Sequence, residues 1–268
     1  MSNRMEKALR ELGEMDELAV RSSPLHRLHP AVKLFLTLAY IVLVLSFGKY
    51  ELSGLFPMLL VPVLLYQIAG IPLRTCFYKL RLVLPLVLAV GLFNPLFDRA
   101  PLLTLGALPV SGGVVSMLTL MGKGIFCLMA SFLLMATTPI DSLCAALRKL
   151  RVPGLLVTLL LLTYRYAGLL TEELAVMTNA YHLRAPGQKG IHVSAWGSFL
   201  GQLLLRTMDR GRELYESMLL RGYHEHFHYA PLRRFSRRDA AWLALSAILL
   251  ALLRFLPVAS WAGRLFVR

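Results

Sequence analysis

The sequence predicts an all-α membrane protein with about five transmembrane helices and a cytosolic platform of three further helices. Three observations lead to this fold class. Hydrophobic residues make up 57% of the 268 residues, which is more than an ordinary soluble domain contains. Several segments of membrane-spanning length carry no charged residue or only one. Lysine and arginine gather in particular links between these segments, as they do where topology follows the positive-inside rule.

Five apolar runs are the predicted transmembrane helices. Two of them contain no charged residue, and the other three contain one each, namely Lys33, Lys123 and Arg254. Trp242 and Trp261 lie towards the two ends of the last run, where interfacial indoles are often found. The predicted spans are residues 31–48, 52–71, 82–97, 114–137 and 240–262.

The distribution of basic residues predicts how this multi-pass protein is oriented in the cell (inner) membrane. The link between the second and third spans contains Arg74, Lys79 and Arg81 and no acidic residue, so we place it in the cytosol. The N-terminus then also lies in the cytosol, with residues 1–30 as a charged leader along the membrane surface. The net charge of +14 favours attraction to anionic lipids over binding to nucleic acid in such a protein.

The first helix of the platform follows the fourth span directly. In the segment TTPIDSLCAALRKLRVP, Thr138 is expected to cap this helix, Pro139 suits its first position and Asp141 suits its first turn. Pro153 is expected to end it. Two longer helices should follow, over residues 154–184 and 194–221.

Hydropathy alone would make residues 155–170 another span. A crossing there would place the many arginines that follow on the outer side, against the positive-inside tendency. We therefore expect this segment to lie against or inside the cytosolic face without crossing. The third platform helix has one apolar and one polar face, which is typical of an amphipathic surface helix. Four parts result: a leader at 1–30, four spans in 31–137, the platform at 138–238, and the last span with a tail at 239–268.

A histidine-rich stretch follows the third platform helix. In HEHFH, the residues His224, His226 and His228 would share one face of an extended chain, and three imidazoles can bind Zn, Cu, Ni or Co. The pattern has little specificity, no matching cluster of acidic residues or histidines occurs elsewhere, and the HExxH signature is absent. We therefore expect an exposed linker and no metal site, with a three-histidine site as the alternative.

The ends of the two long platform helices are alike. Each has an arginine in its last turn followed by a small residue, Arg184-Ala185 in one and Arg221-Gly222 in the other. An arginine complements the negative end of a helix, and glycine permits a left-handed cap, so a purely structural role is one interpretation. Two similar ends on consecutive helices favour a second one, in which each arginine meets a carboxylate of a partner protein.

Three polar features lie in or near predicted membrane segments. Lys123 would be costly at mid-depth unless it is paired or faces a cavity, and we leave its role open between structure and a subunit contact. Asn94-Pro95 suggests a break near the outer end of the third span. Arg165 is expected to have a structural role by pairing with an acid one or two turns on, either Glu172 or Glu173.

Several functional classes lack their motifs in this sequence. There is no P-loop, no GxSxG and no paired-carboxylate motif, which argues against ATP binding or catalysis by this chain. Cys76, Cys127 and Cys144 occur singly, without CxxC spacing, which argues against disulfides and structural zinc. We expect a non-enzymatic protein that holds no cofactor and has a soluble partner beneath its platform.

Several segments of the chain match the pattern of one family. They are SSPLHRLHPAVKL, FNPLF, TTPIDSLCAALRKLRVP and LTYRYAGLLTEELAVMTNA, together with two motifs of the Ala-Arg-Gly type at the helix ends described above. Through most of its length the chain resembles the transmembrane T component of energy-coupling factor (ECF) transporters, and within these the cobalt/nickel branch called CbiQ. Neither motif is the full Ala-Arg-Gly, and the first departs at both flanking positions.

The resemblance implies a function and a set of partners. A T component couples two cytosolic ATP-binding-cassette (ABC) subunits, which bind the ATP, to a CbiM-like membrane S component, which binds the metal. The expected function is thus the coupling subunit of an ATP-driven cobalt or nickel importer. The alternatives are the T component of a vitamin transporter, a membrane metalloenzyme, or a scaffold unrelated to transport. The residues implied in ATPase coupling are Ala180, Leu183, Arg184, Ala185, Leu220, Arg221 and Gly222.

Overall fold

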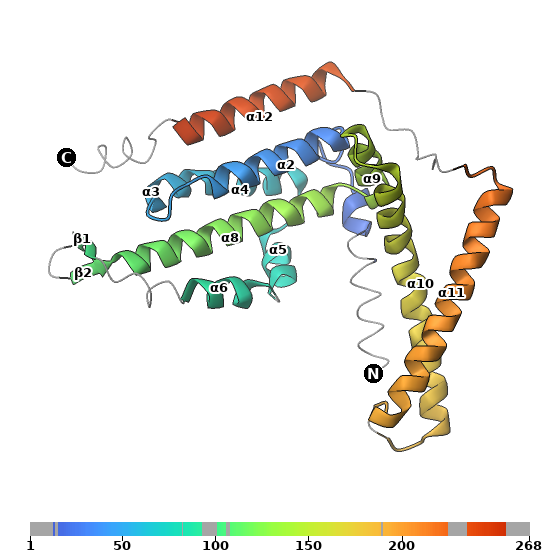
Figure 1. Ribbon diagram of the computed structural model, residues 1–268. Coiled ribbons are helices and arrows are strands. Elements are labelled where there is room, and N and C mark those ends of the chain that lie inside the picture. The colour runs from blue at the N-terminus through green and yellow to red at the C-terminus, as the bar shows by residue number, and fades with distance from the viewer. Residues whose placement is uncertain are drawn as a thin grey trace. The chain divides into compact units, whose positions relative to one another are not determined.

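The computed structural model describes residues 13, 16–81, 83–92, 101–105, 108–188, 190–224 and 235–255. Most of these residues are helical (Figure 1). The chain divides into two compact units. The bundle unit comprises residues 19–138 and 233–268, and the platform unit comprises residues 1–18 and 139–232.

Helices account for the predicted spans of the bundle unit, although they divide the apolar runs differently. The first run forms one helix, whereas the second is divided between two α-helices joined by a 3₁₀ segment. The basic link that follows the second run contains a helix of its own. In chain order the helices are α2 (Pro30–Leu45), α3 (Leu52–Leu55), η1 (Phe56–Leu59), α4 (Leu60–Ala69), α5 (Leu73–Leu80), α6 (Leu84–Leu92), α8 (Gly112–Thr137) and α12 (Arg237–Phe255).

Local sequence explains where α2 and α4 begin and end. Pro30 opens α2, and the side chain of His29 caps it by accepting a hydrogen bond at Nδ1 from the amide of Ala31 (3.1 Å). A proline suits this position because its missing N–H would have no partner in the first turn. At the C-terminal end of α4, Gly70 ends the helix with a left-handed φ of 68°, which glycine adopts without steric cost.

The core of the bundle unit is formed where α2, the α3–α4 segment and α8 pack together, with α12 against α2 (Figure 1). Tyr66 is fully buried in the bundle unit, and its hydroxyl lies within hydrogen-bond distance of the carbonyl of Met129 (3.0 Å) and of Sγ of Cys76 (2.9 Å). The larger apolar side chains of this core are Tyr40, Val44, Phe47, Leu55, Met58, Val61, Phe126 and Leu250.

The described chain is predominantly helical, in agreement with the all-α class that we predicted, and one short pair of strands is added to the helices. Strands β1 (Pro101–Leu105) and β2 (Leu108–Ser111) pair antiparallel, with Leu105 opposite Leu108. They directly precede α8. Hydrophobic periodicity could not reveal this hairpin because each strand is only four or five residues long.

The platform unit contains the three helices expected there. They are α9 (Ile140–Lys149), α10 (Gly154–Arg184) and α11 (Trp196–Leu220), with a 3₁₀ turn, η2 (Val193–Ala195), before the last. A small apolar cluster joins α9 to the start of α10, through the buried side chains of Cys144, Val157 and Leu161.

The start of α9 differs from our expectation. Pro139 rather than Thr138 occupies the cap position, and no side chain hydrogen-bonds to the helix there. The hydroxyl of Thr138 is buried and has no hydrogen-bond partner within the described part of the chain. The predicted cap by Thr138 is therefore wrong, because the proline takes the flanking position and leaves the threonine one residue too early.

Two helices of the described chain are long and apolar enough to cross a membrane by length and composition, α8 with 26 residues and α10 with 31. The α2 and η1–α4 segments are apolar but shorter. The number of spans thus stays a prediction. The same holds for our expectation that the first half of α10 does not cross.

Candidate functional site

Helices α10 and α11 form an antiparallel pair in the platform unit (Figure 1). The turn between them is fixed by Tyr181, whose hydroxyl donates to Oε1 of Gln188 (2.8 Å) and accepts from the amide of His192 (3.2 Å). Further along the pair, the guanidinium of Arg206 forms an ion pair with Glu173. Because these contacts lie at two levels, they define how the helices are aligned.

The end of α11 has the hydrogen bonds of a Schellman motif. The amide of Gly222 donates to the carbonyl of Leu219 (2.9 Å), and the amide of Tyr223 donates to the carbonyl of Met218 (3.0 Å). Gly222 has a φ of 81°, the left-handed conformation that this motif requires after the helix. The predicted left-handed cap is thus confirmed here, with Arg221 as the residue between the last helical turn and the glycine.

The end of α10 is built differently. Arg184 is its last residue, and Ala185 follows with a φ of −127°, its amide donating to the carbonyl of Tyr181 (3.0 Å). The left-handed residue comes two positions later, at Gly187, with a φ of 91°. The two ends therefore share the arginine and the small residue but not the backbone geometry, because alanine does not enter the left-handed region readily.

Both ends present the same pair of side chains to the surroundings. Leu183 is 84% exposed and Leu220 is 91% exposed, and Arg184 and Arg221 are exposed beside them. Ala180, one turn before Arg184, is half-buried. An apolar side chain exposed to this degree gains free energy when another surface covers it, and the neighbouring guanidinium can bind a carboxylate through two parallel hydrogen bonds.

The two ends lie at opposite extremes of the helix pair. Arg184 is 11 residues beyond Glu173, and Arg221 is 15 residues beyond Arg206 in the opposite direction. At about 1.5 Å per helical residue, the arginines are therefore roughly 40 Å apart along the pair. One compact binding pocket cannot hold both, so they offer two separate points of attachment.

The histidine stretch lies mostly outside the described residues. His224 is exposed, while His226 and His228 belong to the part that the structure does not describe. Among the described residues, no group of three or more His, Cys, Asp or Glu side chains is arranged to hold a metal ion. The predicted linker and its alternative, a three-histidine site, both stay predictions.

The pairing that we expected for Arg165 is wrong. Its Nη2 lies 2.8 Å from Oδ1 of Asp141 in α9, while Glu173 pairs with Arg206 across the two long helices. Spacing within one helix favoured a partner on the same helix, but the fold brings a residue of the preceding helix closer. Burial raises the pKa of the neighbouring Cys144 thiol, an effect that the charge of Asp141 increases and that of Arg165 opposes.

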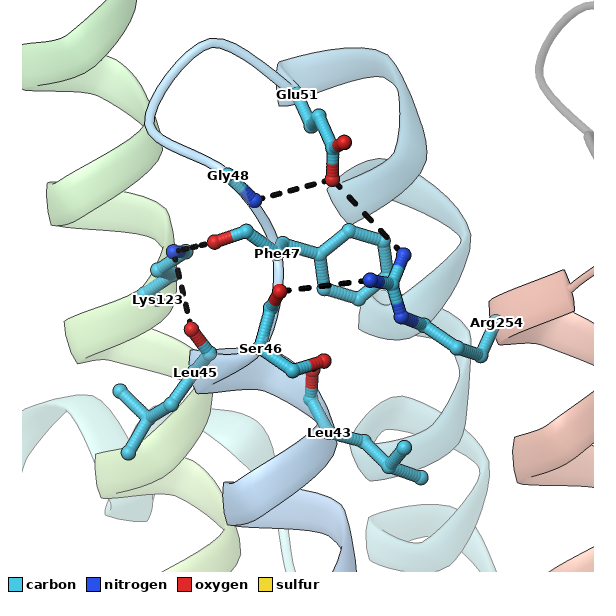
Figure 2. A network of polar contacts seen from close by, with 8 residues as sticks. All are labelled: Leu43, Leu45, Ser46, Phe47, Gly48, Glu51, Lys123 and Arg254. Atoms are coloured by element: carbon cyan, nitrogen blue, oxygen red, sulfur yellow. Dashed lines mark hydrogen bonds and ion pairs between the residues drawn. The ribbon is translucent and has the colours of Figure 1, made fainter.

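Figure 2 shows that Lys123, from the middle of α8, reaches the loop after α2. Its ammonium group donates to the backbone carbonyls of Phe47 and Leu45. Arg254 of α12 holds the same loop, with its guanidinium 4.2 Å from the centre of the Phe47 ring and 3.9 Å from Glu51. The lysine therefore has a structural role within this chain, one of the two that the sequence left open. Asn94 and Pro95 lie outside the described residues.

A second polar connection was not predicted. Asp239 is 1% exposed and accepts hydrogen bonds from the amides of Ser236 (2.9 Å) and His29 (3.2 Å), so it joins the start of α12 to the start of α2. Lys33 is also buried and donates to the carbonyl of Thr137 (2.6 Å) at the end of α8. The sequence did contain a signal for the aspartate, because Ser236 to Asp239 has the spacing of a capping box.

Comparison with known proteins decides the family. The sequence model of the CbiQ family, which is described as "Cobalt transport protein", matches residues 21–229. This range is most of the chain and includes both arginine-bearing helix ends.

The chain belongs to the CbiQ family of cobalt transport proteins.

Named relatives agree with this assignment. The chain is 34% identical over 122 residues to the cobalt transport protein CbiQ of Rhodobacter capsulatus, and 31% identical over 120 residues to the nickel permease LarQ of Lactiplantibacillus plantarum. These matches cover 44% and 45% of this chain, and they span only about half the length of the relatives, 47% and 43%. The energy-coupling factor transporter transmembrane protein EcfT of Leuconostoc gelidum is 23% identical over 258 residues, covering 90% of this chain and 94% of EcfT. The described chain contains two long apolar helices and belongs to a transport family, so we conclude that it is a membrane protein.

Proposed function

We propose that this CbiQ-family chain is the coupling subunit of an ATP-driven ECF-type importer of cobalt or nickel. It would join two cytosolic ABC-type ATP-binding subunits to a CbiM-like membrane S component that binds the metal. The observation that carries the proposal is the presence of an exposed Leu-Arg pair at each end of one antiparallel helix pair, Leu183-Arg184 and Leu220-Arg221. This chain would hold no cofactor and carry out no catalysis, and ATP would be bound by its partners.

Each helix end has what a docking point needs. The arginine would form a bidentate pair with a carboxylate in a groove of one ATP-binding subunit, and the adjacent leucine would fill an apolar part of that groove. Gly222 presents no side chain, and apart from its chain neighbours no atom of the described residues lies within 4 Å of where a Cβ would be, so a partner could approach the backbone there closely.

The separation of the two ends supports a pair of partners. Arginines roughly 40 Å apart along α10 and α11 suit two copies or two related subunits that take one end each. When ATP closes such a pair of subunits, the two grooves would approach and move the helix ends with them. The Glu173–Arg206 ion pair joins the helices, so that this motion would pass to the platform unit as a whole and tilt or release the S component.

Charge reversal at the helix ends tests the proposal. Arg221→Glu should abolish co-purification of the ATP-binding subunits and metal uptake, because it places two carboxylates face to face. Arg184→Glu should weaken both, to a smaller extent because its motif departs further from Ala-Arg-Gly. Arg212→Glu, an exposed position in the middle of α11, is the control and should leave both unchanged. Uptake and complex yield equal to wild type in Arg221→Glu would refute the proposal.

The nature of the cargo needs a separate experiment. The names of the CbiQ and LarQ relatives support cobalt or nickel, and identification of the small membrane protein that co-purifies with the chain would distinguish a metal S component from a vitamin-binding one. Replacing His224, His226 and His228 together with alanine should leave uptake and bound metal unchanged. Loss of bound metal in that variant would instead favour a metal site in this chain.

A further inference from the structure

The bundle unit contains two hollows that share part of their walls. The first is a groove of about 160 Å³ between α2, α4, α8 and α12. The second is a hollow of about 500 Å³ formed by the segment before α2 and the first turn of α12. Leu28 and Trp242 line both of them, so one elongated molecule could occupy the two together.

The groove offers mainly apolar surface to a ligand. Half of its lining residues are leucines, and among these Leu64, Leu245 and Leu249 are exposed. Polar side chains that line the groove donate hydrogen bonds to backbone carbonyls of this chain. Lys33 donates to the carbonyl of Thr137 and Tyr40 donates to that of Met58, while Thr37, Thr137 and Ser246 donate to carbonyls of their own helices. A hydrocarbon chain is the kind of ligand that such a lining fits.

The second hollow is basic and rich in hydroxyl groups. Arg27 and Arg238 line it together with Ser22 and Ser23, and both arginines are exposed. One acid, Asp239, contributes to the lining, but its two oxygens accept from the amides of His29 and Ser236 and it is 1% exposed. The lining thus combines two exposed guanidinium groups with two hydroxyl groups, donors of the kind that bind a phosphate.

Trp242 marks the boundary between the apolar and the basic part. It is half-buried and lies one turn into α12. Indole rings favour the depth in a membrane where headgroups meet acyl chains, which is the depth that a ligand with one charged and one apolar end would require here.

From this arrangement we infer that the two hollows form a binding site for an anionic phospholipid of the surrounding membrane. Its phosphate lies between Arg27 and Arg238, and one acyl chain lies in the groove between α2 and α12. Basic pockets at the ends of transmembrane helices bind anionic headgroups in this way. The bound lipid fills a gap between α12 and the rest of the bundle unit, and it adds to the direct connection made by Asp239.

The test uses the full chain purified in detergent with an equimolar mixture of phosphatidylglycerol and phosphatidylcholine. Native mass spectrometry counts the lipids that stay bound. Wild type should retain more phosphatidylglycerol than phosphatidylcholine. The double variant Arg27→Gln with Arg238→Gln should lose that preference by roughly tenfold or more, since each basic residue near a lipid surface contributes about a factor of five.

A matched control removes the same charge from the same two segments. Arg21→Gln with Arg237→Gln changes two exposed arginines that do not line the hollow, and it should keep the wild-type preference. Equal retention of the two lipids by wild type would overturn the inference. An equal loss in the control variant would also overturn it, because the effect would then come from net charge alone.

A third variant tests the acyl-chain part of the site. Ser246→Leu places a larger side chain in the groove and so reduces the space for an acyl chain, while both arginines stay in place. Retention of phosphatidylglycerol should therefore fall severalfold. Glycerol phosphate, which has the anionic headgroup without the acyl chains, should not displace the lipid at equal concentration. Displacement by glycerol phosphate, together with full retention in Ser246→Leu, would mean that the hollow binds a soluble phosphate and no lipid.

Discussion

The two units of this protein bury their side chains to very different degrees. In the bundle unit, Tyr66 and Met58 are completely inaccessible, and Met58 belongs to a large apolar core cluster. In the platform unit, the buried core is a small cluster that joins Cys144 of α9 to the start of α10, whereas α11 has one buried apolar residue, Phe199. Several leucines of α10 and α11 are exposed by more than half, among them Leu155, Leu204 and Leu205.

The difference lies in the internal core rather than in the exposed surface. The bundle unit has a buried core and polar connections among its own residues, although it too exposes apolar side chains such as Leu86 (67%) and Val42 (64%). The platform unit has long helices whose apolar surface is uncovered in this chain, and such surface marks sites of contact with a protein or a membrane. This agrees with the proposed docking of ATP-binding subunits at the two helix ends. The following predictions test the contrast, in order of decreasing effect.

Tyr66→Ala should have the largest effect on stability. It removes a fully buried ring and the hydrogen bonds to Met129 and Cys76, and we expect a loss of about 4 kcal/mol in the free energy of unfolding. Leu204→Ala, at a position 60% exposed on α11, should change it by less than about 0.5 kcal/mol. Denaturant unfolding in detergent micelles measures both. Similar losses in the two variants would show that the isolated chain is equally well packed in both units.

Lys123→Met should destabilise the bundle unit by about 2 kcal/mol. The change keeps the length of the side chain but leaves the carbonyls of Leu45 and Phe47 without their charged donor. Thermal unfolding of the full chain gives the effect, with Arg212→Met on α11 as the control for loss of a basic residue. A neutral result for Lys123→Met would mean that Arg254 alone is sufficient to hold the loop after α2.

Gly222→Ala should cost about 1 kcal/mol locally, because residue 222 has a φ of 81° and a Cβ disfavours the left-handed conformation. Hydrogen exchange at the amides of residues 222 and 223, which close the α11 end, should become roughly fivefold faster. Ala185→Gly at the other helix end should lack this effect, since Ala185 has a φ of −127°.

Arg151→Gly provides the reciprocal of that change. Arg151 follows α9 with a φ of 64°, and a glycine there should slow exchange of the last α9 amides by a similar factor. If exchange in Gly222→Ala and Arg151→Gly moved in the same direction, backbone conformation would not be the cause.

The ion pair between Arg165 and Asp141 should have the smallest effect. Both side chains are about half exposed, at 53% and 48%, and such pairs contribute about 0.5 kcal/mol. A double-mutant cycle with Arg165→Gln and Asp141→Asn measures the coupling, and Arg210→Gln on α11 serves as an unrelated surface change. Coupling above about 2 kcal/mol would show that this contact fixes α9 to α10 more firmly than its exposure suggests.

Much of the helical organisation could be predicted because it depends on local sequence. The bounds of α10 at residues 154 and 184 agree with the structure, since Pro153 and the Ala-Pro-Gly stretch restrict the backbone at its two ends. Gly222 allowed the left-handed cap of α11 to be predicted for the same reason. The two exposed arginines were likewise predicted as helix ends, because their position in sequence also determines their position along a helix.

Contacts between helices could not be predicted in this way. Lys123 was recognised as a costly charge, but its partners are carbonyls 76 and 78 residues away, and no pattern in a sequence names a backbone carbonyl. Arg165 was assigned the wrong acid because its true partner belongs to another helix. The link from Asp239 to His29 spans 210 residues and depends on how α12 packs against α2.

The sequence by itself thus determined where the helices begin and end, which faces are apolar and which residues stand at the helix ends, because backbone preferences and hydrophobic periodicity act over a few residues. Only the tertiary structure decided which buried charges are paired, where the leader meets α12, and that a basic hollow continues into an apolar groove. These features depend on distances between segments far apart in the chain, and such distances are set by the packing of whole helices.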